Sequence, residues 1–258
     1  MQVARELGME FLMSPEFWLF AVVGFLAQLC DGALGMGFGV ISSTVLASMG
    51  VEPKIVSASV NSAKIVTGGA ATVSHLMYRN IDRQLLLSLG LGGVIGATIG
   101  VLVLTQLPTK WVQTTVSCYL ICVGIIILSR YFRKVEHRER AVNPTVIGIA
   151  GGVLESIAGV WGPLVTTSLV ERGLSPRLVV GSVSVAETIV AIAVSVLLVS
   201  HMGFDSLSRN VIGLMAGALI AAPLGARLTR RMPARLLMAG VGIMVITSSV
   251  VRLSKLYL

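Results

Sequence analysis

Long runs of apolar residues recur along the chain and are separated by short polar segments. Each run is roughly 20 residues long and nearly free of charge, and the runs cover 54–78, 84–107, 110–129, 178–200, 210–226 and 236–251. A helix rises about 1.5 Å per residue, so each run is long enough to cross a hydrocarbon core about 30 Å thick. The pattern therefore predicts an all-α polytopic membrane protein.

The composition points the same way. The 258 residues are 55% hydrophobic and 12% charged, with a mean hydropathy of +0.89, whereas a soluble domain carries about 25% charged residues. The net charge of +8 comes mainly from basic residues between the apolar runs, as the positive-inside rule describes for cytoplasmic loops. We therefore expect a lipid bilayer around the chain and no nucleic acid as a partner.

Neither the N-terminus nor the cysteines indicate a further function. Residues 1–14 contain charges before any apolar stretch forms, so they are predicted to be an N-terminal tail rather than a signal peptide. Cys30, Cys118 and Cys122 lie in apolar segments, and the histidines show no metal-ligand spacing. A structural zinc site takes four ligands, so we expect no metal ion and no other cofactor.

The chain contains an internal repeat. Shifting the sequence by 123 residues aligns 36–82 with 159–205 without a gap, and 12 of the 47 aligned pairs are identical. We therefore divide the chain into a first transmembrane repeat at 15–130, a basic cytoplasmic linker at 131–142 and a second transmembrane repeat at 143–253.

Each repeat opens with an apolar segment that is interrupted by glycine. The first is "FAVVGFLAQLCDGALGMGFGVISSTVLASMG" and the second is "PTVIGIAGGVLESIAGVWGPLVTTSLVERG". Pro163 removes a backbone donor from the second segment, and glycines crowd the middle of the first. Both segments are predicted to be broken, re-entrant helical hairpins, because irregular backbone at membrane depth must be buried in protein.

The distribution of basic residues favours this topology. With two re-entrant hairpins and three crossings per repeat, 13 Lys and Arg residues lie on one side and 6 on the other; with each opening segment crossing once, they divide 11 to 8. The positive-inside rule favours the more uneven division. Three crossings make the repeats inverted, and inverted repeats with broken helices are typical of secondary transporters.

Four ionisable residues interrupt the apolar segments: Lys64, Glu187, Asp31 and Glu155. Lys64 and Glu187 correspond in the repeat, and each lies 11 residues after the proline that begins its helix, which is about half the membrane thickness. A charge at this depth costs roughly 2.5–3.5 kcal/mol on insertion scales and usually marks a transport pathway. Lys64 and Glu187 are explained either as a structural ion pair or as part of a substrate site, and we favour the site.

Smaller polar groups complete the predicted site. Hydroxyl and amide side chains surround the two charged positions, and the half-helix starts near Val40 and Leu164 are expected to offer free backbone N–H groups to an anion. Besides the four ionisable residues, the candidate substrate-binding residues are Asn61, Ser59, Ser182, Ser184, Gly39, Trp161, Gly162 and Thr166.

The chain also resembles a known family. "GGVLESIAGVWGPLVTTSLVERGLSPRLVVGSVSVAETIVAIAVSVL" is similar to the second-half signature of the TauE/SafE family of sulfite exporters and permeases. "GFLAQLCDGALGMGFGV", "SASVNSAKIVTGGAATVSHLMYRNIDRQL" and "AGALIAAPLGARLTRRMPARLL" resemble further blocks of it. The resemblance implies a multi-pass protein of the inner (plasma) membrane that exports or imports sulfite, thiosulfate, sulfonates or other organic anions.

The sequence therefore predicts a secondary transporter or permease of a small anion, with sulfite, another sulfur oxyanion or an organosulfonate as the first substrates to test. Three carboxylates and one ammonium sum to −2 when all are ionised, which favours protons as a coupling ion. A membrane-embedded enzyme and a non-transporting membrane subunit or sensor are the alternatives, although no nucleophile motif supports an enzyme. A homodimer is left open by the sequence.

Overall fold

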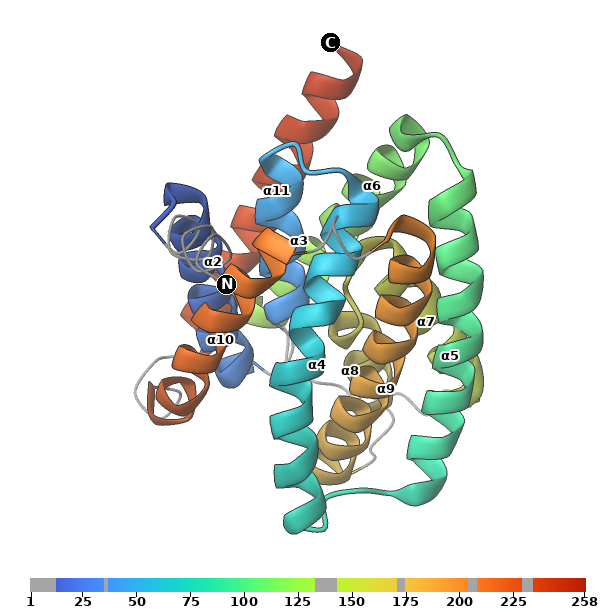
Figure 1. Ribbon diagram of the computed structural model, residues 1–258. Helices are drawn as coiled ribbons and strands as arrows, with labels where there is room; N and C mark the ends of the chain where they lie inside the picture. The colour runs from blue at the N-terminus through green and yellow to red at the C-terminus, as the bar shows by residue number, and fades with distance from the viewer. Residues whose placement is uncertain (1–12, 35–36, 133–142, 171–174, 204–207, 229–233) are drawn as a thin grey trace, which may run out of the picture.

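The computed structural model describes residues 13–34, 37–132, 143–170, 175–203, 208–228 and 234–258. These residues form helices and short connections and contain no strand, so the all-α prediction is confirmed (Figure 1). The first half contains α2 (Pro15–Leu34), α3 (Phe38–Ser48), α4 (Pro53–Met77), α5 (Arg83–Gln106) and α6 (Thr109–Phe132). The second contains α7 (Pro144–Ala158), α8 (Gly162–Val170), α9 (Pro176–Met202), α10 (Ser208–Leu228) and α11 (Ala234–Tyr257).

Local sequence signals set several helix starts. Asp82 caps α5 by accepting a hydrogen bond from the backbone N–H of Leu85 at 3.0 Å, and Asn143 caps α7 by accepting one from Thr145 at 2.9 Å. Pro144 and Pro176 occupy the first turns of α7 and α9, where a missing backbone donor costs nothing because that N–H has no partner within the helix.

Four helical segments among the described residues are long and apolar enough to cross a membrane: Arg83–Gln106, Thr109–Ser129, Arg177–Met202 and Met238–Tyr257. These correspond to four of the six apolar runs in the sequence. The run at 54–78 forms α4, which has 25 residues but carries Asn61, Lys64 and many small polar residues. The run at 210–226 lies in α10, whose apolar part is the shorter segment Val211–Ala222.

Helices from the two halves interleave. α2 packs along α10, α5 packs along α7, α6 packs against α11, and α4 packs against α9 near the centre of the bundle. The last two pairs are antiparallel. Ser62 contacts Ser195 and Thr72 contacts Thr188 between α4 and α9. Thr114 contacts Tyr257 and Gly124 lies against Ile246 between α6 and α11. In Figure 1, α4 begins at the upper end of the bundle, where α11 and the chain end, and runs to the lower end.

Glycines allow two of these helix pairs to approach closely. A Cβ at Gly148 of α7 would lie 2.7 Å from the carbonyl oxygen of Leu89 in α5, and a Cβ at Gly96 or Gly152 would collide with the partner backbone. A Cβ at Gly24 or Gly217 would cause the same collision between α2 and α10. Small residues at helix contacts are typical of membrane bundles, where close backbone approach replaces the hydrophobic effect between helices.

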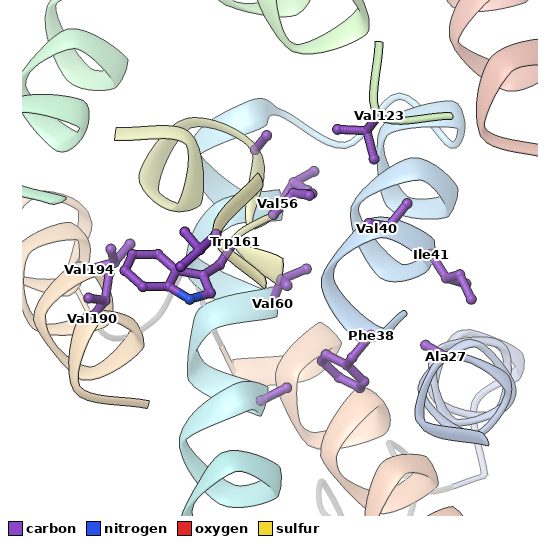
Figure 2. Packing of buried hydrophobic residues seen from close by; sticks show 14 of the residues in the cluster. Ala27, Phe38, Val40, Ile41, Val56, Val60, Val123, Trp161, Val190 and Val194 are labelled. Carbon is purple, nitrogen blue, oxygen red and sulfur yellow. The ribbon is translucent and has the colours of Figure 1, made fainter. Parts of the chain in front are cut away.

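Large apolar side chains fill the space around the two helix breaks. Trp161 is fully buried in the connection between α7 and α8, and its ring points toward Val190 and Val194 of α9 (Figure 2). Phe38, at the start of α3, is also buried, and Figure 2 places it near Ala27 of α2. The core therefore fixes the short half-helices rather than leaving the breaks open.

Some of the predicted segments lie outside the described residues. These are most of the N-terminal tail (1–14) and nearly all of the basic linker (131–142). The connection between α10 and α11 (229–233) lies outside them as well. Among the described helices, a pair of shorter helices followed by three longer ones occurs twice.

Candidate functional site

Both opening segments are broken, as predicted from their glycines. α2 ends at Leu34 and α3 begins at Phe38, while α7 ends at Ala158 and α8 begins at Gly162. Gly159 ends α7 in the left-handed conformation, with φ +66°, and its N–H donates to the Glu155 carbonyl at 2.7 Å. Glycine adopts this conformation without the steric cost that a Cβ adds.

The half-helices begin two residues earlier than predicted. We expected starts near Val40 and Leu164, with Pro163 as the breaking residue. The structure instead places Pro163 in the first turn of α8, a position where proline is tolerated because its missing N–H would have no intrahelical partner. The second break is therefore made by Gly159, Val160 and Trp161.

Lys64 is the centre of the polar site. Its Nζ atom donates hydrogen bonds to Glu155 Oε1 at 2.7 Å, to Glu187 Oε1 at 2.7 Å and to the backbone oxygen of Gly159 at 3.0 Å. The predicted contact between Lys64 and Glu187 is present, and Glu155 is a second carboxylate partner. Lys64 therefore joins α4 of the first half to α7, its terminal turn and α9 of the second half.

All three N–H donors of the Lys64 ammonium group are engaged in hydrogen bonds. A lysine has three N–H donors, and three acceptors surround this one at hydrogen-bond distance. The two carboxylates differ in exposure, because the Glu155 side chain is 0% exposed and the Glu187 side chain is 27% exposed. An anion can reach the ammonium only if one of the three acceptors first gives way.

Asp31 closes the other break. Its Oδ1 atom accepts hydrogen bonds from the backbone N–H groups of Gly37 at 2.8 Å and Phe38 at 3.2 Å. We expected these N–H groups at the start of α3 to be free for an anion, but a carboxylate of the chain already occupies this position. The positive end of the helix dipole explains the arrangement, since it stabilises a nearby negative charge.

A small cavity lies beside Lys64 and Glu187. Its volume is about 70 Å³, which exceeds the roughly 10–15 Å³ that a single water requires. Asp31 is among its lining residues and Glu155 is not. The lining residues are Gln28, Asp31, Phe38, Lys64, Thr67, Gly68, Ala71, Ser184, Glu187 and Thr188.

The predicted polar residues separate into two groups. Ser184 lines the cavity, together with three of the four ionisable residues. Asn61, Ser59 and Ser182 lie elsewhere: the amide of Asn61 donates to the Ser57 carbonyl at 2.9 Å, and the hydroxyl of Ser182 accepts from the Asp82 N–H at 2.8 Å. Ser59 is buried without a hydrogen-bond partner among the described residues.

Of the residues predicted near the two helix breaks, one lies at the centre of the site and three lie away from the cavity. Gly39 lies against the centre of the site, because a Cβ there would be 2.8 Å from Lys64 Nζ and would collide with the Gly159 oxygen. Trp161, Gly162 and Thr166 are buried but do not line the cavity. Trp161 packs against glycines instead, since a Cβ at Gly93 would lie 2.9 Å from its ring.

Six lining residues were not among the candidates from the sequence: Gln28, Phe38, Thr67, Gly68, Ala71 and Thr188. Gln28 lies three residues before Asp31 on α2, so the two side chains share a helix face, and an amide in an apolar segment is the signal that was available. Phe38 carries no polar signal. It reaches the cavity because the break places the start of α3 beside α4.

The arrangement suits binding of a small ion. The cavity is lined by one ammonium, two carboxylates and several hydroxyl groups, and Glu155 adds a third carboxylate at the ammonium. Within the described part of the chain, no group of three or more His, Cys, Asp and Glu residues is arranged to hold a metal ion.

Comparison with known proteins agrees with this chemistry. Residues 20–252 match the family described as sulfite exporter TauE/SafE. The chain is 36% identical over 234 residues to the "Probable membrane transporter protein YtnM" of Bacillus subtilis (strain 168), an alignment that covers 87% of this chain and 78% of that protein. No solved structure matches significantly. The match covers most of the chain, so the chain belongs to the TauE/SafE family and is a membrane transporter rather than an enzyme.

Proposed function

We propose that this transporter moves a small anion through the site beside Lys64, with sulfite, another sulfur oxyanion or an organosulfonate as the substrate class, and that protons are the coupling ion. The observation that carries the proposal is the ammonium of Lys64, which is shared between two carboxylates next to a cavity. The substrate class follows the name of the family that the chain matches.

Proton coupling follows from the occupied ammonium. When Glu187 binds a proton at its carboxylate, its negative charge disappears and its hydrogen bond to Lys64 weakens. One N–H of the ammonium then turns toward the cavity, where an oxygen of the anion accepts it, and Ser184 and Thr188 supply hydroxyl donors. Loss of the proton restores the ion pair and releases the anion. Glu187 suits this role better than Glu155, because it is partly exposed and lines the cavity.

The architecture suits alternating access by two inverted repeats at 15–130 and 143–253. The broken pair α2–α3 corresponds to α7–α8, α4 to α9, α5 to α10 and α6 to α11. The opening helix of each repeat packs against a helix of the other repeat: α2 packs on α10, and α7 packs on α5. Lys64 bonds across the boundary between the repeats, where inverted-repeat transporters bind their substrates. We assign the protein to the plasma membrane, with the basic linker in the cytoplasm.

Flux into proteoliposomes tests this function. Purified protein is reconstituted with an imposed pH gradient, and uptake of sulfite, thiosulfate, an alkylsulfonate and chloride is compared with uptake into protein-free vesicles. We expect flux of at least one sulfur anion that depends on the direction of the gradient. Correctly folded protein that moves none of the sulfur anions would overturn the proposal.

Two glutamate variants test the coupling step. Glu187→Gln removes the proton-binding carboxylate and should leave flux that no longer responds to the pH gradient. Glu52→Gln is the matched control, because Glu52 lies on the surface 4.0 Å from Lys54 and should keep full coupling. Gradient-dependent flux by Glu187→Gln would assign the proton to another group.

A further inference from the structure

A second cavity lies between α3, α6 and α11, at the upper end of the bundle where the chain ends (Figure 1). Its volume is about 500 Å³, several times that of the cavity beside Lys64. Two basic residues line it and none of its lining residues is acidic. The polar lining residues are Ser48, Gln113, Thr247, Ser248, Arg252 and Lys255.

Arg252 distinguishes this cavity from an ordinary basic surface. Lys255 is in the last turn of α11, where a cation stabilises the helix end without any ligand. Arg252 lies almost a turn earlier and is only partly exposed. Its Nη1 atom is buried and has no hydrogen-bond partner among the described residues. A guanidinium carries five N–H donors, so Arg252, which lines the cavity, has N–H groups besides those of Nη1 to offer an oxyanion there.

The neighbouring groups have the donors that an oxyanion needs. A guanidinium binds two oxygens of one anion at once, and an ammonium adds a second charge. The side chains of Gln113 and Ser248 also line the cavity, and no hydrogen bond to a described residue occupies either of them. The cavity therefore combines two positive charges with neutral donors.

Helix α3 links this cavity to the central site. Ala47 and Ser48 line the cavity, and Ser43 and Thr44 lie one turn below them on the same faces of α3. The hydroxyls of Ser43 and Thr44 are buried and have no partner among the described residues. A Cβ at Gly159, whose carbonyl binds Lys64, would be 2.8 Å from the Ser43 hydroxyl. Two buried, unpaired hydroxyls therefore lie on α3 between the residues that line the cavity and the turn that binds Lys64.

The cavity at the lower end is different in charge. It measures about 720 Å³ and is lined by Asp82, with no basic residue among its lining residues. Ser88, Asn143 and Thr145 also line it. These two cavities thus differ in charge, since the upper one is lined by two basic residues and the lower one by none.

We propose that the cavity between α3, α6 and α11 is an oxyanion-binding vestibule, in which Arg252 and Lys255 capture the substrate anion before it moves along α3 to the central site. The substrate's path from the vestibule to the central site rests on the proposed transport function, but anion binding by the cavity can be tested without transport. Phosphate oxygens of an acidic lipid have the same chemistry as a soluble oxyanion, and we commit to the soluble anion.

Modification of a single cysteine tests binding directly. In a variant whose three native cysteines are replaced by serine, Ser248→Cys is placed in the cavity and Gln106→Cys, exposed at the same end, serves as a reference site. Protein in phosphatidylcholine nanodiscs is treated with negatively or positively charged methanethiosulfonates. We expect the negative reagent to be favoured at position 248 and not at 106. Sulfate and methanesulfonate, which do not consume the reagent, should slow modification at position 248 only.

Charge removal supplies the second readout. Arg252→Gln with Lys255→Gln should lower the preference for the negative reagent at position 248 about tenfold at low salt, and by less at high salt. Lys110→Gln is the matched control, because Lys110 lies at the same end over the ring of Tyr257, at 4.6 Å, and does not line the cavity. Protection that requires phosphatidylglycerol in the nanodisc and is never given by a soluble anion would overturn the proposal, as would an unchanged preference in the double variant.

Transport kinetics then test the vestibule and the proposed function separately. With flux established, Arg252→Gln should raise the KM for the anion at least about threefold at one face of the membrane and leave the maximal rate nearly unchanged. A change in the maximal rate without a change in KM would contradict capture by the vestibule. Absence of flux in the unaltered protein would count against the proposed function and not against anion binding by the cavity.

Discussion

Replacing Lys64 by methionine should show which carboxylate depends on the ammonium. The change keeps an unbranched side chain of similar length but removes three hydrogen bonds, of 2.7, 2.7 and 3.0 Å. Among the described residues, Glu155 then loses its one side-chain hydrogen-bond partner, and its side chain is 0% exposed. Removing one member of a buried ion pair costs about 3–5 kcal/mol, because the remaining charge stays buried without compensation.

The two carboxylates should contribute unequally to that loss. Adding Glu155→Gln to Lys64→Met removes the uncompensated buried charge and should recover more than half of the lost free energy of unfolding. Adding Glu187→Gln instead should recover less, since its side chain is 27% exposed and retains part of its hydration. Lys110→Met, which removes an exposed lysine, should change the free energy by less than about 1 kcal/mol.

Reversible unfolding by sodium dodecyl sulfate in mixed micelles, followed by tryptophan fluorescence, measures these differences. The buried Trp161 lies near the site and reports its loss. The decisive quantity is the coupling between Lys64→Met and Glu155→Gln in a double-mutant cycle. Additivity within about 0.5 kcal/mol would mean that the two residues do not interact energetically, and the ion-pair reasoning would then be refuted.

Two further predictions concern the helix breaks and the topology. Gly39→Ala should abolish flux and lower stability, because the new Cβ would lie 2.8 Å from Lys64 Nζ and collide with the Gly159 oxygen. Gly240→Ala is the control, because a Cβ there meets nothing within 4 Å, and it should behave like the unaltered protein. Normal flux by Gly39→Ala would contradict the close packing of Gly39 against Lys64 and Gly159. Single cysteines at positions 82 and 109 should be labelled by an impermeant reagent from opposite sides of the membrane, with position 82 cytoplasmic, and labelling of both from one side would overturn the proposed topology.

The sequence by itself determined the elements and the charged residues of the site. Runs of roughly 20 apolar residues required helices, because every backbone polar group in a bilayer must be paired within its own segment. Glycine clusters required two breaks, and both occur. The 123-residue repeat placed Lys64 opposite Glu187, and the structure joins these two side chains. Each of these conclusions rests on local chemistry or on spacing along the chain, which sequence records directly.

The tertiary structure alone decided which partner each charge takes. Nothing in the spacing distinguished Asp31 from Glu155, yet Asp31 caps its own half-helix while Glu155 binds Lys64 from the other repeat. The free N–H groups expected at the start of α3 are occupied for the same reason. In the sequence, Arg252 is one of the basic residues near the end of the chain, and only the packing of α3 and α6 beside α11 makes it line a cavity. Such contacts depend on how helices distant in sequence are oriented, and no local pattern encodes that orientation.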